Sequence, residues 1–260
     1  MTSPLAAAAH QALALAEPAY LRHYRRGRFA VIDGVAYTGS ELPGPGFNFA
    51  ACLGPCPPLA AVLPTARDFF ADAPAGWGVL VEGDAGHPVE AALRAAGWAV
   101  AEDEPALVRP DLVGVAAGGR PDGLVVRPVA TEADRLAVVR VLAAAYDAPP
   151  ELADVMLPTL GFARDPAMCW LVGERDGKPV TAGGAAHVTG TAVVCGLGTL
   201  PGHRGRGQGA AVLRALLADA ARRGCTAAAL RSGPASVPLY ERHGFRYACR
   251  HRTYAAPADA

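Results

Sequence analysis

The sequence is poor in lysine, in aromatic residues and in long uncharged hydrophobic runs. Lys178 is its one lysine against 23 arginines, and 7% of its 260 residues are aromatic. Basic and acidic residues balance, so the formal net charge is zero. No apolar stretch reaches the length of about 18 residues that a membrane span needs, and the alanine-rich start lacks the basic residues of a signal peptide. We therefore expect a cytoplasmic protein without a membrane segment, and binding to nucleic acid is not favoured.

Metal-ligand spacing is missing as well. The six cysteines are Cys52, Cys56, Cys169, Cys195, Cys225 and Cys249. The pair formed by Cys52 and Cys56 has neither a second pair nor a histidine at zinc spacing, so we expect no metal site. Several of the others lie in apolar runs typical of strands. We therefore expect free, buried thiols in a reducing compartment.

The chain is long enough for two domains, and its hydrophobic content of 52% is ample for their cores. The glycine-rich residues 113–123 are the expected linker between a first domain, 1–112, and a second domain, 124–260. Residues 1–120 carry eight arginines and twelve acidic residues, net −4, whereas residues 121–260 carry net +4. The basic half suits a small polyanion.

Periodicity and turn residues predict a similar order of elements in both halves. In the first half we expect a helix over 4–26 that Pro18 kinks or splits, a hairpin over 28–38, strands at 47–53, 78–82 and 106–109, and helices at 59–70 and 89–96. In the second half we expect strands at 124–128, 168–175, 179–188, 192–200 and 226–230, and helices at 131–146, 151–160 and 208–223.

The stretch from Val193 to Gly224 reads as a strand, a glycine-rich loop and a helix. The loop has the sequence Arg-Gly-Arg-Gly-Gln-Gly at 204–209. A loop of this kind at the start of a helix presents several unpaired N–H groups, to which the helix dipole and the arginines add positive charge. The pattern indicates a site for a phosphate or a diphosphate.

Two familiar phosphate loops do not fit this stretch. A P-loop needs Lys-Ser/Thr after its last glycine, and Ala210-Ala211 stands there. A dinucleotide fingerprint needs its first glycine directly after the strand and a carboxylate at the end of the next strand. Here Pro-Gly-His-Arg intervenes, and the next strand ends in Arg231-Ser232.

The loop resembles instead the pyrophosphate loop of the GNAT acyltransferase superfamily, Arg/Gln-x-x-Gly-x-Gly/Ala, with Arg204, Gly207 and Gly209 at its fixed positions. Downstream, residues 239–245 match the family's Leu-Tyr-x-x-x-Gly-Phe. The resemblance covers about residues 124–256. It implies an α/β fold in which a mixed, mostly antiparallel sheet is flanked by helices, and transfer of an acyl group from acetyl-CoA or another acyl-CoA to an amine.

The first half looks like a degenerate copy of the second, so that the protein would be a tandem form of the superfamily. Residues 93–98 lie over 240–245, with Leu93 in the place of Tyr240. Pro55-Cys-Pro-Pro stands where the second half has its glycine loop. Because proline has no N–H, that loop cannot hold a diphosphate in the same way.

The resemblance also implies the site residues. The cofactor-binding set is Leu197, Gly198, Thr199, Leu200, Arg204, Gly205, Arg206, Gly207, Gln208, Gly209, Ala210, Gly233 and Ser236. An N–H near Thr199 or Leu200 would hold the developing oxyanion. Tyr240 is the candidate acid for the departing thiolate.

The general base is not identified. Family members often carry a glutamate in the strand before the loop, and residues 193–198 contain no carboxylate. His187, Glu174, Asp147 and Glu151 are possible substitutes. A water chain is equally possible, and an acidic acceptor amine would need no base.

We expect the acceptor to be a small-molecule amine, and the protein to be a monomer or a homodimer. Two alternatives stay open. In the first alternative, the acyl donor is an aminoacyl-tRNA or a carrier-protein thioester. In the second, the protein is a non-catalytic binding protein with the same fold.

Overall fold

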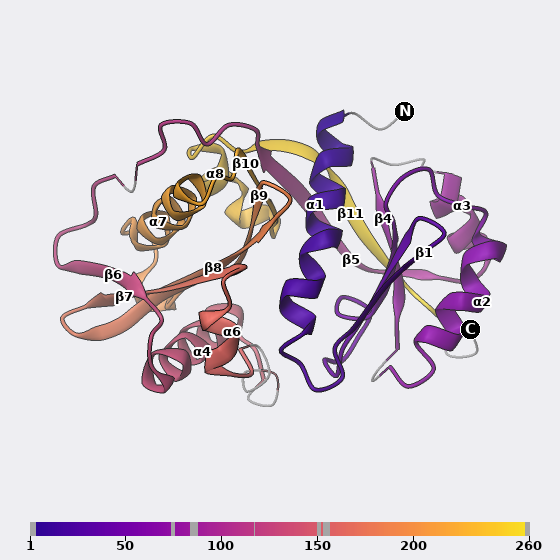
Figure 1. The fold of residues 1–260 in the computed structure, drawn as a ribbon, viewed down its shortest axis with the longest axis horizontal. Helices are drawn as coiled ribbons and strands as arrows, with labels where there is room; N and C mark the ends of the chain where they lie inside the picture. The colour runs from indigo at the N-terminus through magenta and orange to yellow at the C-terminus, as the bar shows by residue number, and fades with distance from the viewer. Residues whose placement is uncertain are drawn as a thin grey trace. The chain divides into compact units, whose positions relative to one another are not determined.

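The structure, a computed structural model, describes residues 4–73, 76–83, 88–116, 118–149, 152 and 157–257. Its Cα atoms pack into two units, whose elements are labelled in Figure 1. The first unit comprises Met1–Val108, Arg231–Glu241 and Phe245–Ala260, and the second comprises Arg109–Leu230 and Arg242–Gly244. The C-terminal residues therefore pack with the first unit. From the sequence we expect a first domain that ends at residue 112 and a second that begins at residue 124. That division of the sequence into two copies stays a prediction.

The first unit is a mostly antiparallel sheet flanked by helices. Its strands follow the order β1-β2-β3-β4-β11-β5. Its elements are α1 (Pro4–Leu21), β1 (Arg28–Ile32), β2 (Val35–Gly39), β3 (Phe49–Cys52), α2 (Leu59–Phe69), β4 (Gly78–Glu82), α3 (Pro88–Ala95), β5 (Ala99–Arg109), the 3-10 turn η2 (Pro234–Ser236), α8 (Val237–Glu241) and β11 (Arg246–Ala255).

The helix α1 and the hairpin that follows it test the expectations for the N-terminus. The hairpin β1–β2 turns at Asp33 and Gly34, whose φ angles of 50° and 77° suit this turn, as predicted. Pro18 does not split the first helix, because α1 runs unbroken through Pro18 and ends three residues later at Leu21. The alternative expectation, that Pro18 kinks the helix, stays a prediction. Burial of its alanine and leucine side chains outweighs the lost hydrogen bond.

Strand β11 lies inside the sheet of the first unit. It pairs antiparallel with β4 over Glu82–Gly78 and with β5 over Val108–Ala99. Its Tyr254 belongs to the core beneath α2 and α3, together with Trp77, Leu93 and Trp98. The last strand of the chain is therefore part of the interior of the first unit.

The second unit is built in the same way, with strand order β10-β9-β8-β7-β6. Its elements are β6 (Leu124–Pro128), α4 (Glu132–Tyr146), α6 (Leu160–Arg164), β7 (Met168–Arg175), β8 (Lys178–Val188), β9 (Thr191–Thr199), the 3-10 turn η1 (Pro201–His203), α7 (Gln208–Arg222) and β10 (Ala227–Arg231). A capping box starts α4, because Thr131 and Asp134 exchange side-chain to backbone hydrogen bonds. Glu151 and residues 153–156 of the expected helix lie outside the described residues.

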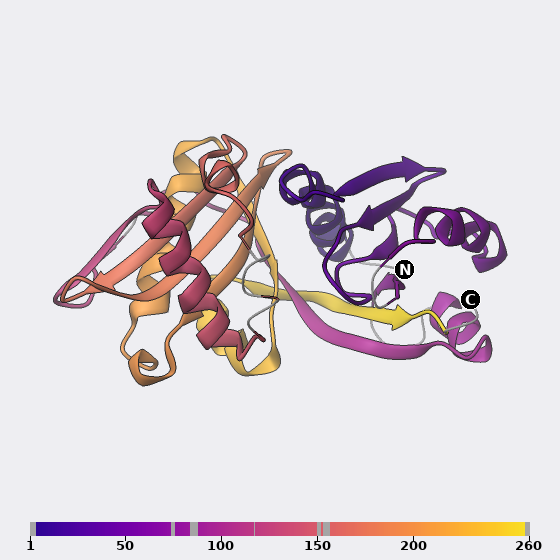
Figure 2. The ribbon, with the colours of Figure 1, turned by 90° about the horizontal axis from the view of Figure 1, so that it is seen from below.

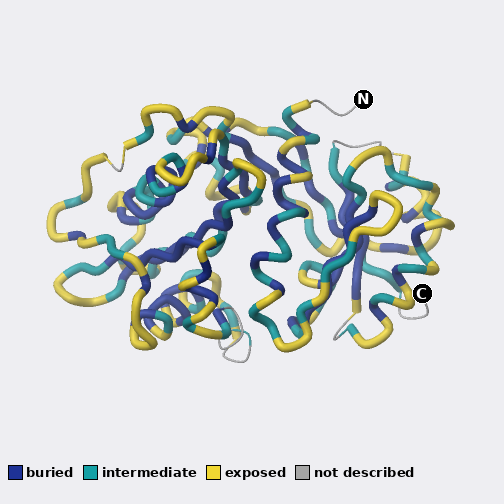
Figure 3. The backbone as a smooth tube through the Cα atoms, in the orientation of Figure 1, coloured by how far each residue is buried: buried dark blue, intermediate teal, exposed yellow. Residues whose placement is uncertain are grey.

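Helices α4 and α7 cover opposite faces of this sheet, as Figures 1 and 2 show. Neighbouring glycines on β8 mark the two faces. A Cβ on Gly183 would meet Val212 and Leu216 of α7, whereas a Cβ on Gly184 would meet the indole of Trp170 on the other side. Figure 3 shows that both β8 and the inner side of α7 are buried. The core of the unit therefore has two layers, one on each side of the sheet.

The two units repeat one pattern of pairing. The first has two antiparallel pairs and then the short parallel pair β3–β4. The second has three antiparallel pairs and then the short parallel pair β9–β10. Along the chain, the turn after α3 is repeated after α8, although both helices are counted with the first unit. Trp98 N donates to Leu93 O at 3.0 Å, and Phe245 N donates to Tyr240 O at 3.1 Å. The internal repeat inferred from the sequence is thus present in the backbone.

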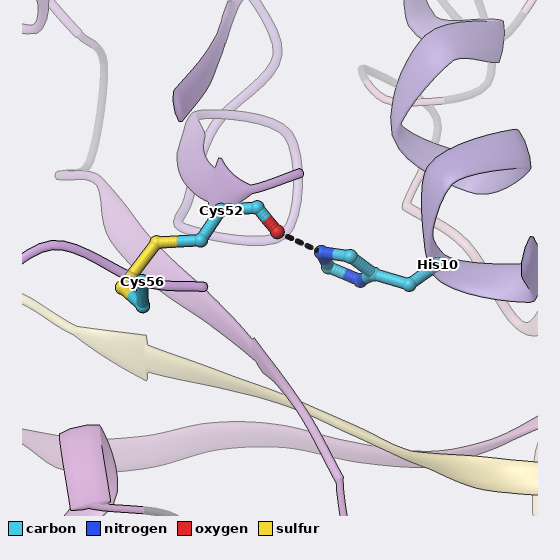
Figure 4. The surroundings of a disulfide bond; sticks show 3 residues. All are labelled: His10, Cys52 and Cys56. Carbon is cyan, nitrogen blue, oxygen red and sulfur yellow. Dashed lines mark hydrogen bonds between the residues drawn. A yellow bond between two sulfur atoms is a disulfide. The ribbon is translucent and has the colours of Figure 1, made fainter. Parts of the chain in front are cut away.

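The cysteines correct one expectation. Cys52 and Cys56 form a disulfide, drawn in Figure 4, so they are not free thiols. The turn after β3 brings their Cα atoms to 5.2 Å, a separation that a disulfide can bridge. Cys169, Cys225 and Cys249 are buried without a disulfide, as predicted, and Cys195 is half-buried. In the part of the chain that the structure describes, no helix is long and apolar enough to cross a membrane.

Candidate functional site

The glycine loop connects β9 to α7 and leaves the start of the helix open. Gly205 and Gly207 both have φ of 74°, a left-handed conformation that glycine adopts without strain. Gly207 is the N-cap of α7, and no side chain caps the first turn. The N–H groups of Gln208, Gly209 and Ala210 therefore lack acceptors within the helix. This is the backbone arrangement that binds anions at helix N-termini.

The strands β9 and β10 separate just before this loop. They pair in parallel only over Thr191–Val193 and Ala227–Ala229, whereas β9 continues to Thr199. From Val194 onwards, the edge of β9 that faces β10 has no ladder partner in β10. Backbone groups on such an edge are able to pair with an extended ligand that carries amides.

Arg204 is held by backbone carbonyl groups. Its Nε donates to Thr199 O at 3.1 Å, and its Nη2 donates to Ala145 O at 2.7 Å. The guanidinium therefore ties the end of β9 to the end of α4, a positioning role that the sequence did not indicate. Arg206 is exposed at the tip of the loop.

Thr199 and Leu200 were the candidates for an oxyanion donor. Leu200 N donates to Val180 O at 3.0 Å, so its N–H is already used. The Thr181 hydroxyl donates to Gly198 O at 2.8 Å and lies 2.9 Å from the Thr199 hydroxyl. Because the Thr181 proton is committed to Gly198, the Thr199 hydroxyl is the donor of that second bond. Thr181 is a residue that the sequence reasoning missed, since a threonine within a strand gives no signal.

The end of β9 packs closely against α4. A Cβ on Gly198 would lie 2.8 Å from Ala145 Cβ, so only glycine fits there without a shift. The carbonyl of Leu197 accepts a hydrogen bond of 3.0 Å from the Tyr146 hydroxyl. These contacts align the strand that the resemblance assigns to the pantetheine arm.

Gln208 and Gly209 begin α7 directly behind the loop. Gln208 is 1% exposed, and neither atom of its amide has a partner among the described residues. A Cβ on Gly209 would meet the Thr199 hydroxyl at 3.1 Å, so this glycine lets the helix approach β9. Both residues serve the packing of the loop against the strand.

The remaining predicted residues, Gly233, Ser236 and Tyr240, lie in segment 231–241, which is counted with the first unit. The carbonyl of Gly233 accepts from the Ser232 hydroxyl and from Ser236 N, both at 3.0 Å. Tyr240 is buried, and its ring meets Phe245 edge-on at 5.7 Å. The aromatic packing fixes the ring of the tyrosine.

His187 and Glu174, two of the candidate bases, have other surroundings. The His187 ring lies 3.8 Å from Asp219, which is about 17 Å along α7 from Gln208. Burial and Arg223 lower the pKa of His187, against the opposing effect of Asp219. Glu174 accepts two hydrogen bonds from Arg127, the shorter at 2.6 Å, and that guanidinium also binds Asp134. Neither residue is favoured as a base beside the loop.

Asp147, another candidate base, lies near the end of α4 that Arg204 of the glycine loop contacts. It is exposed and forms the C-cap of α4 with φ of 52°, two residues after the Ala145 carbonyl that binds Arg204. Glu151 lies outside the described residues. No group of three or more potential metal ligands occurs among the residues that are described.

Comparisons with known proteins give a family and a fold to which this chain is similar. Residues 135–245 match the model of the acetyltransferase (GNAT) family. A GCN5-related N-acetyltransferase from Kribbella flavida is similar over 96% of both chains, with a TM-score of 0.70 and 20% identity. Another, from Sphaerobacter thermophilus, has a TM-score of 0.63 and 17% identity, covering 97% of this chain and 92% of the other.

A tandem GNAT protein from the clavulanic acid biosynthesis pathway is similar over 85% of this chain and 78% of its own, with a TM-score of 0.61 and 15% identity. No curated protein matches the sequence. The fold is thus that of GNAT acetyltransferases, a mixed, mostly antiparallel sheet flanked by helices. More particularly, the chain is similar over residues 135–245 to the acetyltransferase (GNAT) family, whose members in general bind acetyl-CoA.

Proposed function

We propose that the protein transfers an acetyl group from acetyl-CoA to the primary amine of a small molecule, by direct attack in a ternary complex. The observation that carries the proposal is the uncapped start of α7 behind two left-handed glycines, beside the point where β9 and β10 part. The N–H groups of residues 208–210 would bind the diphosphate, and the free edge of β9 would pair with the pantetheine amides.

The neutral amine nitrogen attacks the thioester carbonyl carbon and the C–S bond breaks. The nitrogen loses one proton to water as the amide forms, and the thiolate takes up a proton. We assign the oxyanion contact to the backbone near Thr199, because the Leu200 N–H is already bonded. Because Tyr240 occupies the tyrosine position of the family's Leu-Tyr-x-x-x-Gly-Phe motif, we assign it as the acid that protonates the thiolate. We assign no protein base, since β9 carries no carboxylate.

Two glycines at opposite ends of α7 provide a matched test of the anion site. Gly207 and Gly224 have φ of 74° and 85°, so alanine strains either position by about 1–2 kcal/mol. Acetyl-CoA titrated calorimetrically should bind Gly207→Ala at least about tenfold more weakly than wild type, because hydrogen bonds to a charged group are lost. Gly224→Ala should bind normally. Equal affinity of the two variants would remove the loop from the binding site.

Release of CoA thiol with a panel of amines tests the reaction itself. Tyr240→Phe keeps the ring packing and should lower kcat about tenfold or more without changing the affinity for acetyl-CoA. A wild-type kcat would exclude the acid role. Binding of acetyl-CoA without thiol release for any amine would favour the non-catalytic alternative.

A further inference from the structure

The first unit contains a cavity of about 330 Å³ at the end of its own parallel strand pair. It lies among α1, the turn after β3, β4 and α3. β3 and β4 pair only over Phe49–Ala51 and Gly78–Leu80, and the cavity begins where they separate. This is the place in the repeat that the glycine loop site has in the second unit.

The walls of the cavity are mainly apolar. They include Leu53, Val79, Val89 and the disulfide of Cys52 and Cys56. A cavity of this size and character fits the apolar body of a small molecule. Pro55 contributes no N–H, so the turn does not offer the row of donors that a diphosphate needs.

His10 of the cavity wall is hydrogen-bonded to Cys52 and to a second histidine, His251. His10 Nε2 lies 2.7 Å from Cys52 O, the contact drawn in Figure 4. A carbonyl oxygen only accepts, so the proton is on Nε2, and in the neutral ring Nδ1 accepts from His251 Nε2 at 3.3 Å. His251 Nδ1 is then left as an acceptor, and it has no partner among the described residues. His251 is 1% exposed, and burial holds its pKa well below the usual range, so it adds no positive charge.

Glu82 brings an acidic group to the cavity wall. Its Oε2 is buried and has no hydrogen-bond partner in the described part of the chain. Glu82 faces His251 across β4 and β11, so the two side chains share one face of the sheet. Neither arginine nor lysine is among the described residues that line the cavity. Gln11 adds an amide to the lining, and its Nε2 donates to Leu53 O at 2.9 Å. The described lining therefore offers a carboxylate without a protein cation to pair with it.

We propose that this cavity binds a small, mainly apolar molecule that carries a primary ammonium group. The ammonium donates to Glu82, and the apolar body packs against the disulfide and the valines of β4 and α3. An ammonium group has three N–H donors and a positive charge, which is the complement of a buried carboxylate oxygen without a partner. The site is independent of acetyl transfer.

The disulfide gives a readout that belongs to this cavity alone. A phosphine reduces it, iodoacetamide alkylates the two thiols, and peptide mass spectrometry follows Cys52 and Cys56 separately from the other cysteines. 2-Phenylethylamine in the cavity should slow this modification severalfold in the full-length protein without acetyl-CoA. 2-Phenylethanol, which has the same body and no charge, should have little effect.

Variants assign the protection to the carboxylate. Glu82→Gln keeps the shape of the side chain. It should raise the concentration of amine needed to protect the cysteines by about tenfold or more. Asp68→Asn removes the same charge from an exposed position on α2 and should behave as wild type. Ala7→Phe fills the cavity from α1 and should abolish the effect of the amine, with folding checked by circular dichroism.

Three results would overturn the proposal. They are no protection of the wild-type cysteines by the amine, equal protection by the alcohol, and unchanged protection in Glu82→Gln. None of them bears on the proposed acetyl transfer, which is measured by thiol release.

Discussion

Glu17 is an acidic residue whose pKa is shifted by its surroundings on α1. It stands on α1 among alanines and leucines. Burial raises the pKa of its carboxyl group from 4.5 to about 7, and the positive charge of Arg231 opposes the rise. A carboxyl group in this position is held in its neutral form over a wider range of pH than an exposed one.

This raised pKa predicts a loss of stability with rising pH. Between pH 4.5 and 7 the folded protein keeps a proton that the unfolded chain releases, so the free energy of unfolding falls as pH rises through this window. The contribution of Glu17 is at most about 3 kcal/mol, from 1.36 kcal/mol per pKa unit. Urea unfolding at pH 4.5 and 8 should therefore show a smaller drop for Glu17→Gln than for wild type. Glu104→Gln serves as the control, and an identical drop in Glu17→Gln would contradict the prediction.

Residue roles were predicted from the sequence where a motif fixes a backbone shape. The glycine-rich loop at 204–209 and the hairpin over 28–38 are examples, since the left-handed conformations of Gly205, Gly207 and Gly34 suit glycine. Partners far apart in the sequence were not predictable. Nothing local to Arg204 indicates the carbonyl of Ala145, 59 residues away, to which it donates a hydrogen bond.

At the scale of elements, the close approach of α4 to β9 depends on glycine. A Cβ on Gly198 would lie 2.8 Å from Ala145 Cβ and 3.0 Å from Leu142 Cδ2, and the short alanine cannot rotate away. A Cβ on Gly202, in the turn η1, meets nothing within 4 Å. The same added methyl group therefore has different costs at the two positions.

Gly198→Ala should lower the free energy of unfolding by about 1–3 kcal/mol, the usual cost of overpacking. Gly202→Ala should stay within about 0.5 kcal/mol of wild type. Chemical denaturation of both variants measures the difference. Equal stabilities would mean that α4 is free to shift away from the strand.

Element boundaries were predicted well wherever periodicity and turn chemistry agree. The strands at 78–82, 124–128 and 168–175 have the predicted bounds. The helix through Pro18 was not predictable, because burial of its small side chains outweighs the local cost of proline. The glycine loop and the helix of the site were predicted from the sequence. The hydrogen bonds of Thr181, Thr199 and Leu200 were not, because they depend on how β8 and β9 pair.

At the scale of the whole molecule, the position of β11 determines whether the N-terminal part of the chain is able to fold alone. This strand lies between β4 and β5 in the first unit, although it follows the second unit in the chain. Without it, β4 and β5 would each lose the ladder that they share with β11, and Tyr254 would leave the core. Sequence order suggested two consecutive domains, and long-range strand pairing is the information that it lacks.

A fragment of residues 1–112 should therefore show no cooperative unfolding transition in urea. Addition of a peptide that covers 244–257 should restore a transition, because it supplies the missing strand. Circular dichroism during denaturation measures both. Cooperative unfolding of the fragment alone, with the steep urea dependence of a folded domain, would contradict this prediction.

The place of β11 also bears on the time course of synthesis. A ribosome completes every strand of the second unit before it releases Arg246–Ala255. Until then the first unit has an open gap between β4 and β5, whose bare edges are suited to aggregation or to capture by a chaperone. A message cut short after the second unit would leave that gap unfilled, and the defective product would be marked for proteolysis by its own exposed strands.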